Sequence, residues 1–127
     1  MGEKDIQMVL LQHPDGKTAL IRGDVDAWAG LDPYMAQTEL EDGSRLFFRD
    51  PSLNTYGFLN AREDFIKQHP DETLRLLKVY ERGRQLSLAN PDGLRDTLAK
   101  AANLTAPVAA KELERTDLSN PVIGKEH

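Results

Sequence analysis

The pattern of apolar and polar positions in the first sixty residues predicts short strands separated by turns. The first apolar run has no polar face, which is typical of a strand that is covered on both sides. Between the first two runs, turn residues and Asp15 predict a short helix that ends near Arg22. This order predicts a right-handed βαβ unit with a parallel strand pair. The expected strands cover residues 6–11, 25–29, 45–48 and 55–59.

From Asn60 onward the pattern changes to the spacing of helices. Asn60 and Glu63 have the spacing of a capping box, which predicts a helix through about Gln68. A capping residue that is followed within two positions by a proline recurs later in the chain, and this pattern is typical of helix starts. Three further helices are therefore expected, over residues 70–89, 92–102 and 107–115.

These patterns predict an α/β fold in two parts that pack as one compact unit. Residues 1–60 form the α/β part with a small mixed sheet, and residues 61–127 form a helical C-terminal half. Three or four short strands make a small sheet, and the last residues lack a closing element. We therefore expect the chain to be a fragment of a longer protein.

Composition narrows the possible functions. The chain has 127 residues, a net charge of −5 and no cysteine, so it suits one domain without an electrostatic footprint for nucleic acid. Three separated histidines give no metal-ligand spacing, and we expect neither a metal nor a cofactor. The N-terminus lacks the apolar region of a signal peptide, and no apolar run approaches the ~20 residues of a membrane span.

The stretch of residues 23–34 is the strongest candidate for a functional site. It holds the only tryptophan, Trp28, where a predicted strand leads through a turn into a helix. Ligands commonly bind at such places in open α/β sheets. Asp26 and Trp28 are two positions apart, so on a strand their side chains point to the same side.

Each of these residues also has a structural interpretation. Trp28 fits a core aromatic, and Asp26 fits a carboxylate that caps backbone near a strand end; an acidic group in an apolar strand needs a partner. Asp32 fits the N-cap of a helix that begins at Pro33 and runs to about Leu40, a contact worth about 1 kcal/mol.

A second group of candidates surrounds the last predicted strand. Asn54 and Tyr56 offer neutral hydrogen-bond donors, which suit an anion without the desolvation cost of a full charge. Gly57 lets backbone approach a ligand or a neighbouring strand closely. The alternative is a turn asparagine and a tyrosine at the rim of the fold. Acidic residues of the helices instead have the spacing of surface ion pairs with Lys67, Lys111 and Arg115 and their neighbours.

Three stretches together resemble one family. They are Arg-Gly-Asp-Val-Asp-Ala-Trp-Ala-Gly-Leu-Asp-Pro-Tyr at 22–34, Asn-Thr-Tyr-Gly-Phe-Leu-Asn-Ala-Arg-Glu-Asp-Phe-Ile-Lys-Gln-His-Pro at 54–70, and Glu-Arg-Thr-Asp-Leu-Ser-Asn-Pro-Val-Ile-Gly at 114–124. The chain resembles the periplasmic solute-binding proteins of ABC importers for aliphatic sulfonates, taurine and nitrate-like solutes. The third stretch is most similar to the aliphatic-sulfonate branch.

The resemblance implies a two-lobed type II binding protein that closes on its solute and delivers it to a membrane permease, as part of sulfur metabolism. This chain then corresponds to most of the second lobe, a three-layer α/β unit, plus the C-terminal helices. The parent protein would be periplasmic or otherwise extracytoplasmic, and its cleft would carry Asp26, Trp28, Asp32, Asn54, Tyr56 and Gly57.

Within the family, the resemblance gives two of these residues a role. Trp28 would pack on an alkyl chain, and the aspartate that matches Asp32 takes the ammonium of taurine in some members. Leu31 stands where the family commonly has a tryptophan before Asp-Pro, so at this position the sequence gives the least information about which solute binds.

Three alternative functions remain open at this point. One is an enzyme on the same fold, such as a desulfinase or a thiamine-precursor synthase, although the chain lacks the cysteine or histidine cluster of such enzymes; we therefore expect no catalysis. Another is the effector-binding domain of a transcription regulator. The third is a structural unit that only forms a homodimer through exposed apolar surface.

Overall fold

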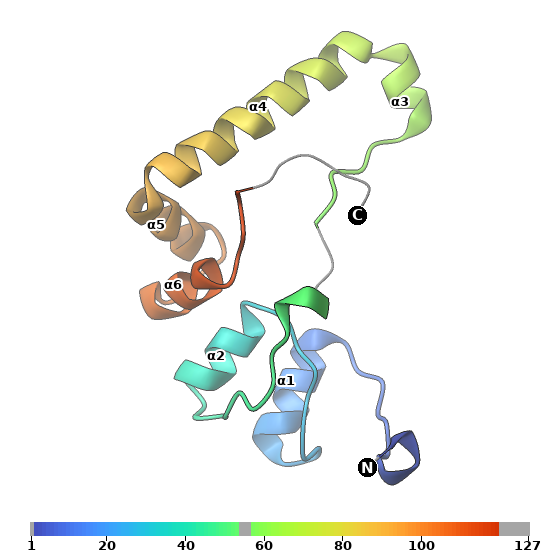
Figure 1. The fold of residues 1–127 in the computed structure, drawn as a ribbon, viewed down its shortest axis with the longest axis vertical. Coiled ribbons are helices and arrows are strands. Elements are labelled where there is room, and N and C mark those ends of the chain that lie inside the picture. The colour runs from blue at the N-terminus through green and yellow to red at the C-terminus, as the bar shows by residue number, and fades with distance from the viewer. Residues whose placement is uncertain (1, 54–56, 120–127) are drawn as a thin grey trace.

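Helices make up the regular structure of the part of the chain that the computed structural model describes, residues 2–53 and 57–119. Helices α1 and α2 lie at one end of the elongated molecule, and α4 runs from α5 to α3 at the other (Figure 1). Short 3₁₀ turns, η1 and η2, accompany them. The elements are η1 (Glu3–Asp5), α1 (His13–Arg22), α2 (Tyr34–Leu40), η2 (Pro51–Leu53), α3 (Glu63–Gln68), α4 (Pro70–Ala89), α5 (Pro91–Ala101) and α6 (Ala106–Glu114).

The predicted α/β fold with a small mixed sheet is wrong for this chain. No strand forms in residues 2–53 or 57–119, although strands were expected at 6–11, 25–29, 45–48 and 55–59. Residues 55 and 56 of the last expected strand lie outside the described residues. The first of these runs is exposed to solvent, with Leu10 91% accessible. A strand is held by hydrogen bonds to a neighbouring strand. The apolar run supplied the strand-like pattern, but no described segment pairs with it.

Local signals placed the helices well. The predicted helix at 70–89 is α4, with Pro70 in its first turn. Gly23 caps the C-terminal end of α1 directly after Arg22. Its left-handed backbone (φ +76°) lets its N–H bond to the carbonyls of Ala19 and Leu20. Asn90 caps α5, because its side chain accepts a hydrogen bond of 3.0 Å from the N–H of Gly93.

The expected capping box at Asn60 does not form. Helix α3 begins at Glu63, so Glu63 lies in the first turn rather than at the third helical position. The side chain of Asn60 instead donates to the carbonyl of Phe58. A capping box needs the cap residue three positions before the glutamate and next to the helix start, and here the helix starts too late.

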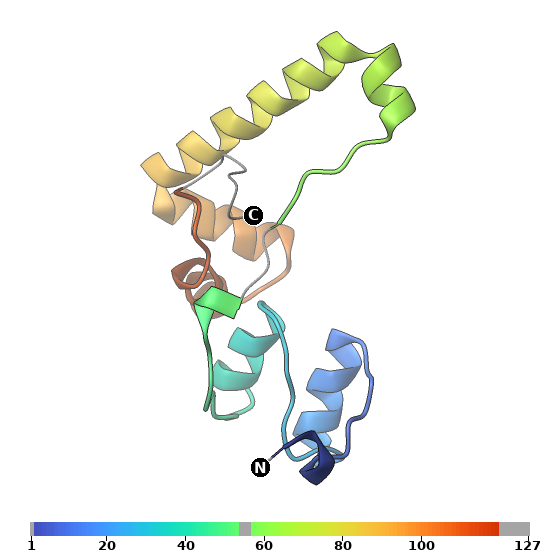
Figure 2. The same ribbon diagram turned by 45° about the vertical axis from the view of Figure 1, so that its right-hand side comes forward.

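The most buried residues lie where α2 meets α6. Ala36 of α2 and Val108 and Ala109 of α6 are fully buried, and these two helices pack against each other. Helix α2 also packs on α1, and α5 packs on α6, so α2 and α6 form the centre of the molecule (Figures 1 and 2). Small side chains at this contact let the two helix backbones approach closely.

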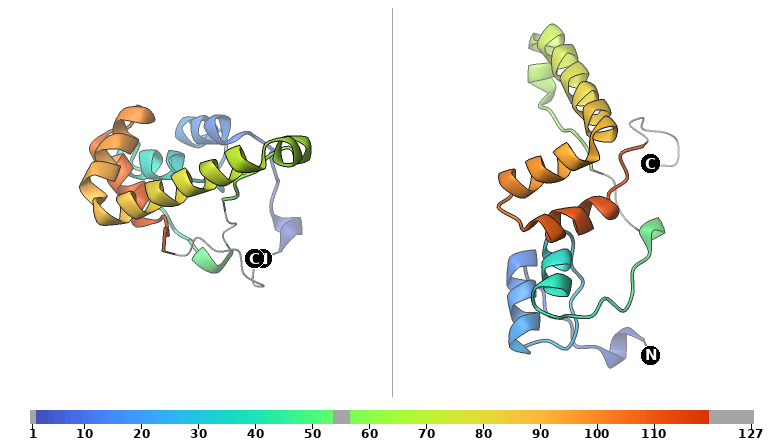
Figure 3. Two further views of the ribbon diagram at one scale, coloured as in Figure 1. Left: turned by 90° about the horizontal axis from the view of Figure 1, so that it is seen from above. Right: turned by 90° about the vertical axis from the view of Figure 1, so that its left-hand side faces the viewer.

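Helix α4 projects away from this centre. It is in contact only with α3 and α5 among the described elements, and the views in Figure 3 show it as an arm beside the rest of the chain. None of its residues is buried. Its apolar side chains are therefore largely open to solvent, namely Leu74, Leu76, Leu77, Val79, Tyr80, Leu86 and Leu88.

We expect Val108→Ala to lower the free energy of unfolding by about 2 kcal/mol, because it removes buried methyl groups and leaves a cavity between α2 and α6. Urea unfolding followed by circular dichroism measures this. The control is Val79→Ala on α4, where the side chain is 66% exposed and a loss below about 0.5 kcal/mol is expected. Equal losses in both variants would contradict the placement of the core.

Candidate functional site

The candidate stretch at 23–34 connects α1 to α2 without regular structure. After the turn at Gly23, residues 24–26 form a bend and residues 27–31 have no assigned secondary structure. Asp26 is exposed, whereas Trp28 is partly buried. Strand alternation, the reason for expecting these two side chains on one side, is therefore absent from this stretch.

Trp28 lies against α1. Its pyrrole end faces Gly16 of α1 and its benzene end faces Gly30, so closely that a Cβ atom on either glycine would come within 3.0 Å of the ring. The imidazole of His13 meets the indole edge-on, with ring centroids 6.5 Å apart at 64°. Trp28 thus joins the stretch to α1 and keeps part of its surface accessible.

Asp32 is held by two donors. Its Oδ1 accepts a hydrogen bond of 2.9 Å from the backbone N–H of Ala36, which satisfies a free donor in the first turn of α2. The same oxygen accepts a bond of 3.3 Å from Nη1 of Arg115. The predicted cap position is one residue early, because α2 begins at Tyr34 and Pro33, not Asp32, is its N-cap residue. Asp32 still bonds the N–H of Ala36, and Arg115 supplies a second contact that local sequence does not reveal.

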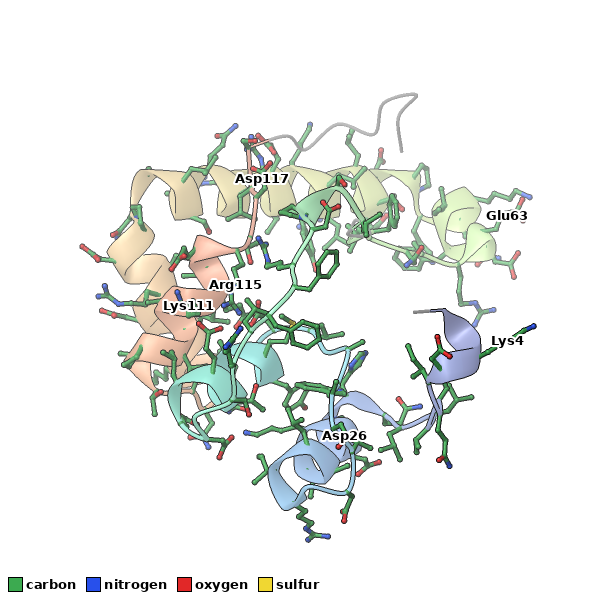
Figure 4. All side chains as sticks on the ribbon, turned by 60° about the horizontal axis from the view of Figure 1, so that its bottom comes forward. Lys4, Asp26, Glu63, Lys111, Arg115 and Asp117 are labelled. Atoms are coloured by element: carbon green, nitrogen blue, oxygen red, sulfur yellow. The ribbon has the colours of Figure 1, made fainter. Side chains whose placement is uncertain are left out.

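Arg115 stands at the C-terminal end of α6 and reaches across to α2 (Figure 4). Its side chain is only 8% exposed and pairs with Asp32 and, through Nη2, with Glu39. Burial lowers the pKa of the guanidinium, but bonds and charges from Glu39 and Asp32 outweigh this and raise its pKa overall. The cation thus stays charged between two carboxylates.

Glu112 is the third carboxylate near this ion pair. Its Oε2 atom is buried and has no hydrogen-bond partner among the described residues. Burial raises the pKa of this carboxyl, and the negative charge of Asp32 raises it further.

Sequence spacing predicted the helical ion pairs correctly except at Glu112, which makes no ion pair among the described residues, and at Arg115. Lys67 pairs with Glu63 at 2.6 Å and Lys111 with Glu114 at 3.1 Å, both on exposed surface. Arg115 was expected to pair within its own helix. Its partners instead lie 83 and 76 residues earlier, and no local spacing rule could have indicated them.

The second group of candidates is only partly described. Asn54 and Tyr56 lie outside the described residues, so the structure does not place them. Gly57 is exposed, and a Cβ atom added there would meet nothing within 4 Å. Of the second group, the described residues therefore place only Gly57, whereas Trp28 and Asp32 both lie in the described stretch at 23–34.

Two cavities accompany these features. One of about 350 Å³ adjoins the start of the candidate stretch, between Val9 and Leu11 on one side and Asp24 and Val25 on the other. The other, of about 390 Å³, lies among α4, α5 and α6 near Leu88, away from the stretch.

In the described ranges, no cluster of three histidine, aspartate or glutamate side chains could hold a metal ion. No helix in these ranges has both the length and the apolarity to cross a bilayer.

We expect Arg115→Gln to lower the free energy of unfolding by about 2 kcal/mol, because it leaves Asp32 and Glu39 without their shared cation. This is less than for a fully buried pair, since both carboxylates keep some contact with water. Urea unfolding of this variant is compared with Arg62→Gln, whose partner Asp64 is exposed. Matching losses in the two variants would contradict a structural role for Arg115.

The raised pKa of Glu112 makes the stability depend on pH. When the pKa of a carboxyl is higher in the folded state than in the unfolded state, ionising that carboxyl costs more in the folded protein. The free energy of unfolding therefore falls as pH rises from the lower pKa through the higher one. We therefore expect Glu112→Gln to stabilise the protein at pH 7 and to have a smaller effect at pH 4, where the carboxyl is mostly protonated. Chemical unfolding at both pH values measures this. Glu114→Gln is the exposed control, and a gain that does not depend on pH would refute the effect.

Two curated relatives match almost all of the chain. The first, "Putative aliphatic sulfonates-binding protein" of Bacillus subtilis (strain 168), is 28% identical over 121 residues, which cover 94% of this chain and 36% of that protein. The second, of the same description from Escherichia coli (strain K12), is 31% identical over 111 residues, which cover 87% of this chain and 35% of that protein. The chain thus spans about a third of the length of these relatives.

These matches confirm the resemblance to aliphatic-sulfonate-binding proteins that the three sequence stretches indicated. No solved structure matches the chain significantly. Residues 1–94 match the family described as NMT1/THI5 like. Since this match covers well over half of its residues, the chain belongs to the NMT1/THI5-like family.

Proposed function

We propose that this chain is part of the substrate-binding component of an ABC importer for aliphatic sulfonates or similar small anions. The observation that carries the proposal is the match of nearly the whole chain to two relatives named for binding aliphatic sulfonates. Both are named as binding proteins, which supports binding rather than catalysis. The motif at 22–34 and its partly accessible tryptophan agree with a site for a small organic anion.

The proposed site uses the residues that the sequence singled out. Trp28 offers an accessible aromatic surface for the alkyl chain of the solute. Asn54 and Tyr56 donate hydrogen bonds to the sulfonate oxygens, and Gly57, with open space around it, lets backbone approach the solute. Asp26 is exposed and accepts hydrogen bonds from the hinge or from a solute that carries a donor, such as the ammonium of taurine.

Asp32 has a more specific place in this proposal. Its Oδ1 already accepts bonds from Ala36 and Arg115. Arg115 also offsets its charge, which lowers the repulsion between this carboxylate and an anionic solute nearby. We therefore place Asp32 at the edge of the site, where it also stabilises the first turn of α2.

The proposed partners follow from the same assignment. The full protein works outside the cytoplasm, in the periplasm where there is one, and passes its solute to a membrane permease. The exposed apolar side chains of α4 also offer a surface for a homodimer or for another part of the same protein. Light scattering during gel filtration distinguishes a dimer from a monomer.

Isothermal titration tests the proposed solute. The 127-residue chain and the complete product of its gene are titrated with butanesulfonate, octanesulfonate, taurine, nitrate and sulfate. We expect saturable binding of the alkanesulfonates. Trp28→Ala should weaken that binding about tenfold, the effect of losing one apolar contact. Asp26→Ala should weaken the binding of taurine about tenfold, because the ammonium of taurine can donate a hydrogen bond to this carboxylate and an alkanesulfonate cannot.

Asp24→Ala is the matched control, because Asp24 is a neighbouring aspartate that is equally exposed, and it should leave affinity unchanged. If the complete gene product binds no sulfonate, the proposed function is wrong. If it binds sulfonates with the same affinity in the Asp26 and Trp28 variants, the proposed site is wrong.

A further inference from the structure

The two glycines around Trp28 are unusual in this chain because a side chain on either would collide with the same ring. At five other described glycines an added Cβ atom would meet nothing within 4 Å, and at Gly93 it would meet only the cap residue Asn90. At Gly16 it would come within 3.0 Å of Nε1 and Cδ1 of Trp28, and at Gly30 within 3.0 Å of Cη2, Cζ2 and Cζ3. Both ends of one indole therefore rest on glycine.

Backbone conformation does not explain these glycines. Only Gly23 and Gly43 have positive φ among the described glycines, so Gly16 and Gly30 adopt angles that other residues adopt freely. Gly16 lies inside α1, where glycine costs about 0.5–1 kcal/mol relative to alanine. The feature that requires glycine at position 16 is the space that the indole occupies.

The contacts fix the orientation of the ring. Gly16 belongs to α1 and is buried, whereas Gly30 belongs to the stretch itself, so the indole is held by two separate parts of the chain. His13 contacts its edge. Part of Trp28 stays accessible to solvent. An aromatic side chain that is already immobile loses little conformational entropy when a ligand packs against it.

We propose that Gly16 and Gly30 are positioning residues that hold Trp28 as a preformed aromatic wall for the alkyl chain of the solute. This proposal rests on the proposed function, because it assigns a task to residues that do not themselves touch the solute. It also gives that site a specificity. Contact with this wall increases the affinity for an alkanesulfonate with each added methylene, and it does not increase the affinity for nitrate or sulfate.

The test compares Gly16→Ala and Gly30→Ala with Gly83→Ala. Gly83 also lies inside a helix, α4, but a Cβ atom there meets nothing. Trp28 is the only tryptophan, so tryptophan fluorescence and the tryptophan bands of the near-ultraviolet circular dichroism report on this ring. We expect both signals to change in the first two variants and to stay constant in Gly83→Ala.

Titration with alkanesulfonates of four to eight carbons gives the second readout. In the unaltered protein, affinity should rise roughly fourfold for each methylene that packs on the indole. This increment should shrink in Gly16→Ala and Gly30→Ala and persist in Gly83→Ala. If the spectra and the increment are unchanged in the first two variants, the positioning role is wrong.

The outcomes separate this proposal from the proposed function. If the unaltered gene product binds no alkanesulfonate, the proposed function is wrong and Trp28 has no solute to hold, whatever the spectra show. If Gly16→Ala fails to fold, it is combined with Trp28→Phe, whose smaller ring makes room for the methyl group. Recovery of folding in the double variant supports the contact with Trp28, and failure of the double variant overturns it.

Discussion

Arg115 joins α6 to α2 through charge, across more than seventy residues of sequence. Its side chain reaches from the end of α6 to Asp32 and Glu39, at the start and near the end of α2. The same two helices carry the fully buried residues Ala36, Val108 and Ala109. Because few residues are fully buried, we expect this cation, which two partly buried carboxylates share, to help keep α2 against α6. It also keeps Asp32 in place at the end of the candidate stretch.

The candidate stretch depends on contacts at both of its ends. Asp32 is fixed by Ala36 and Arg115, and Trp28 is fixed by Gly16 and Gly30. Each contact connects the irregular segment to a helix, so the segment has defined side-chain positions without strand pairing. This is how a stretch with no regular secondary structure can still present an ordered site.

The helices could be predicted because their signals are local. Pro70 and the cap residue Asn90 act within one turn of their helices. The sheet could not be predicted correctly from residues 6–11, because an apolar run describes what a strand would bury and not whether a neighbouring strand exists. The sequence likewise singled out Trp28 and Asp32 for the site, but Arg115 was missed because its partners are 76 and 83 residues away.

The sequence by itself determined where the longer helices lie, which family the chain resembles and which stretch carries the candidate site, since each depends on neighbouring residues or on a continuous motif. Only the tertiary structure decided that the apolar runs pair with no strand in residues 2–53 or 57–119, that Arg115 contacts Asp32, and that Gly16 leaves room for Trp28. These features arise where segments distant in sequence come together. Their energies depend on burial and distance, which local patterns do not contain.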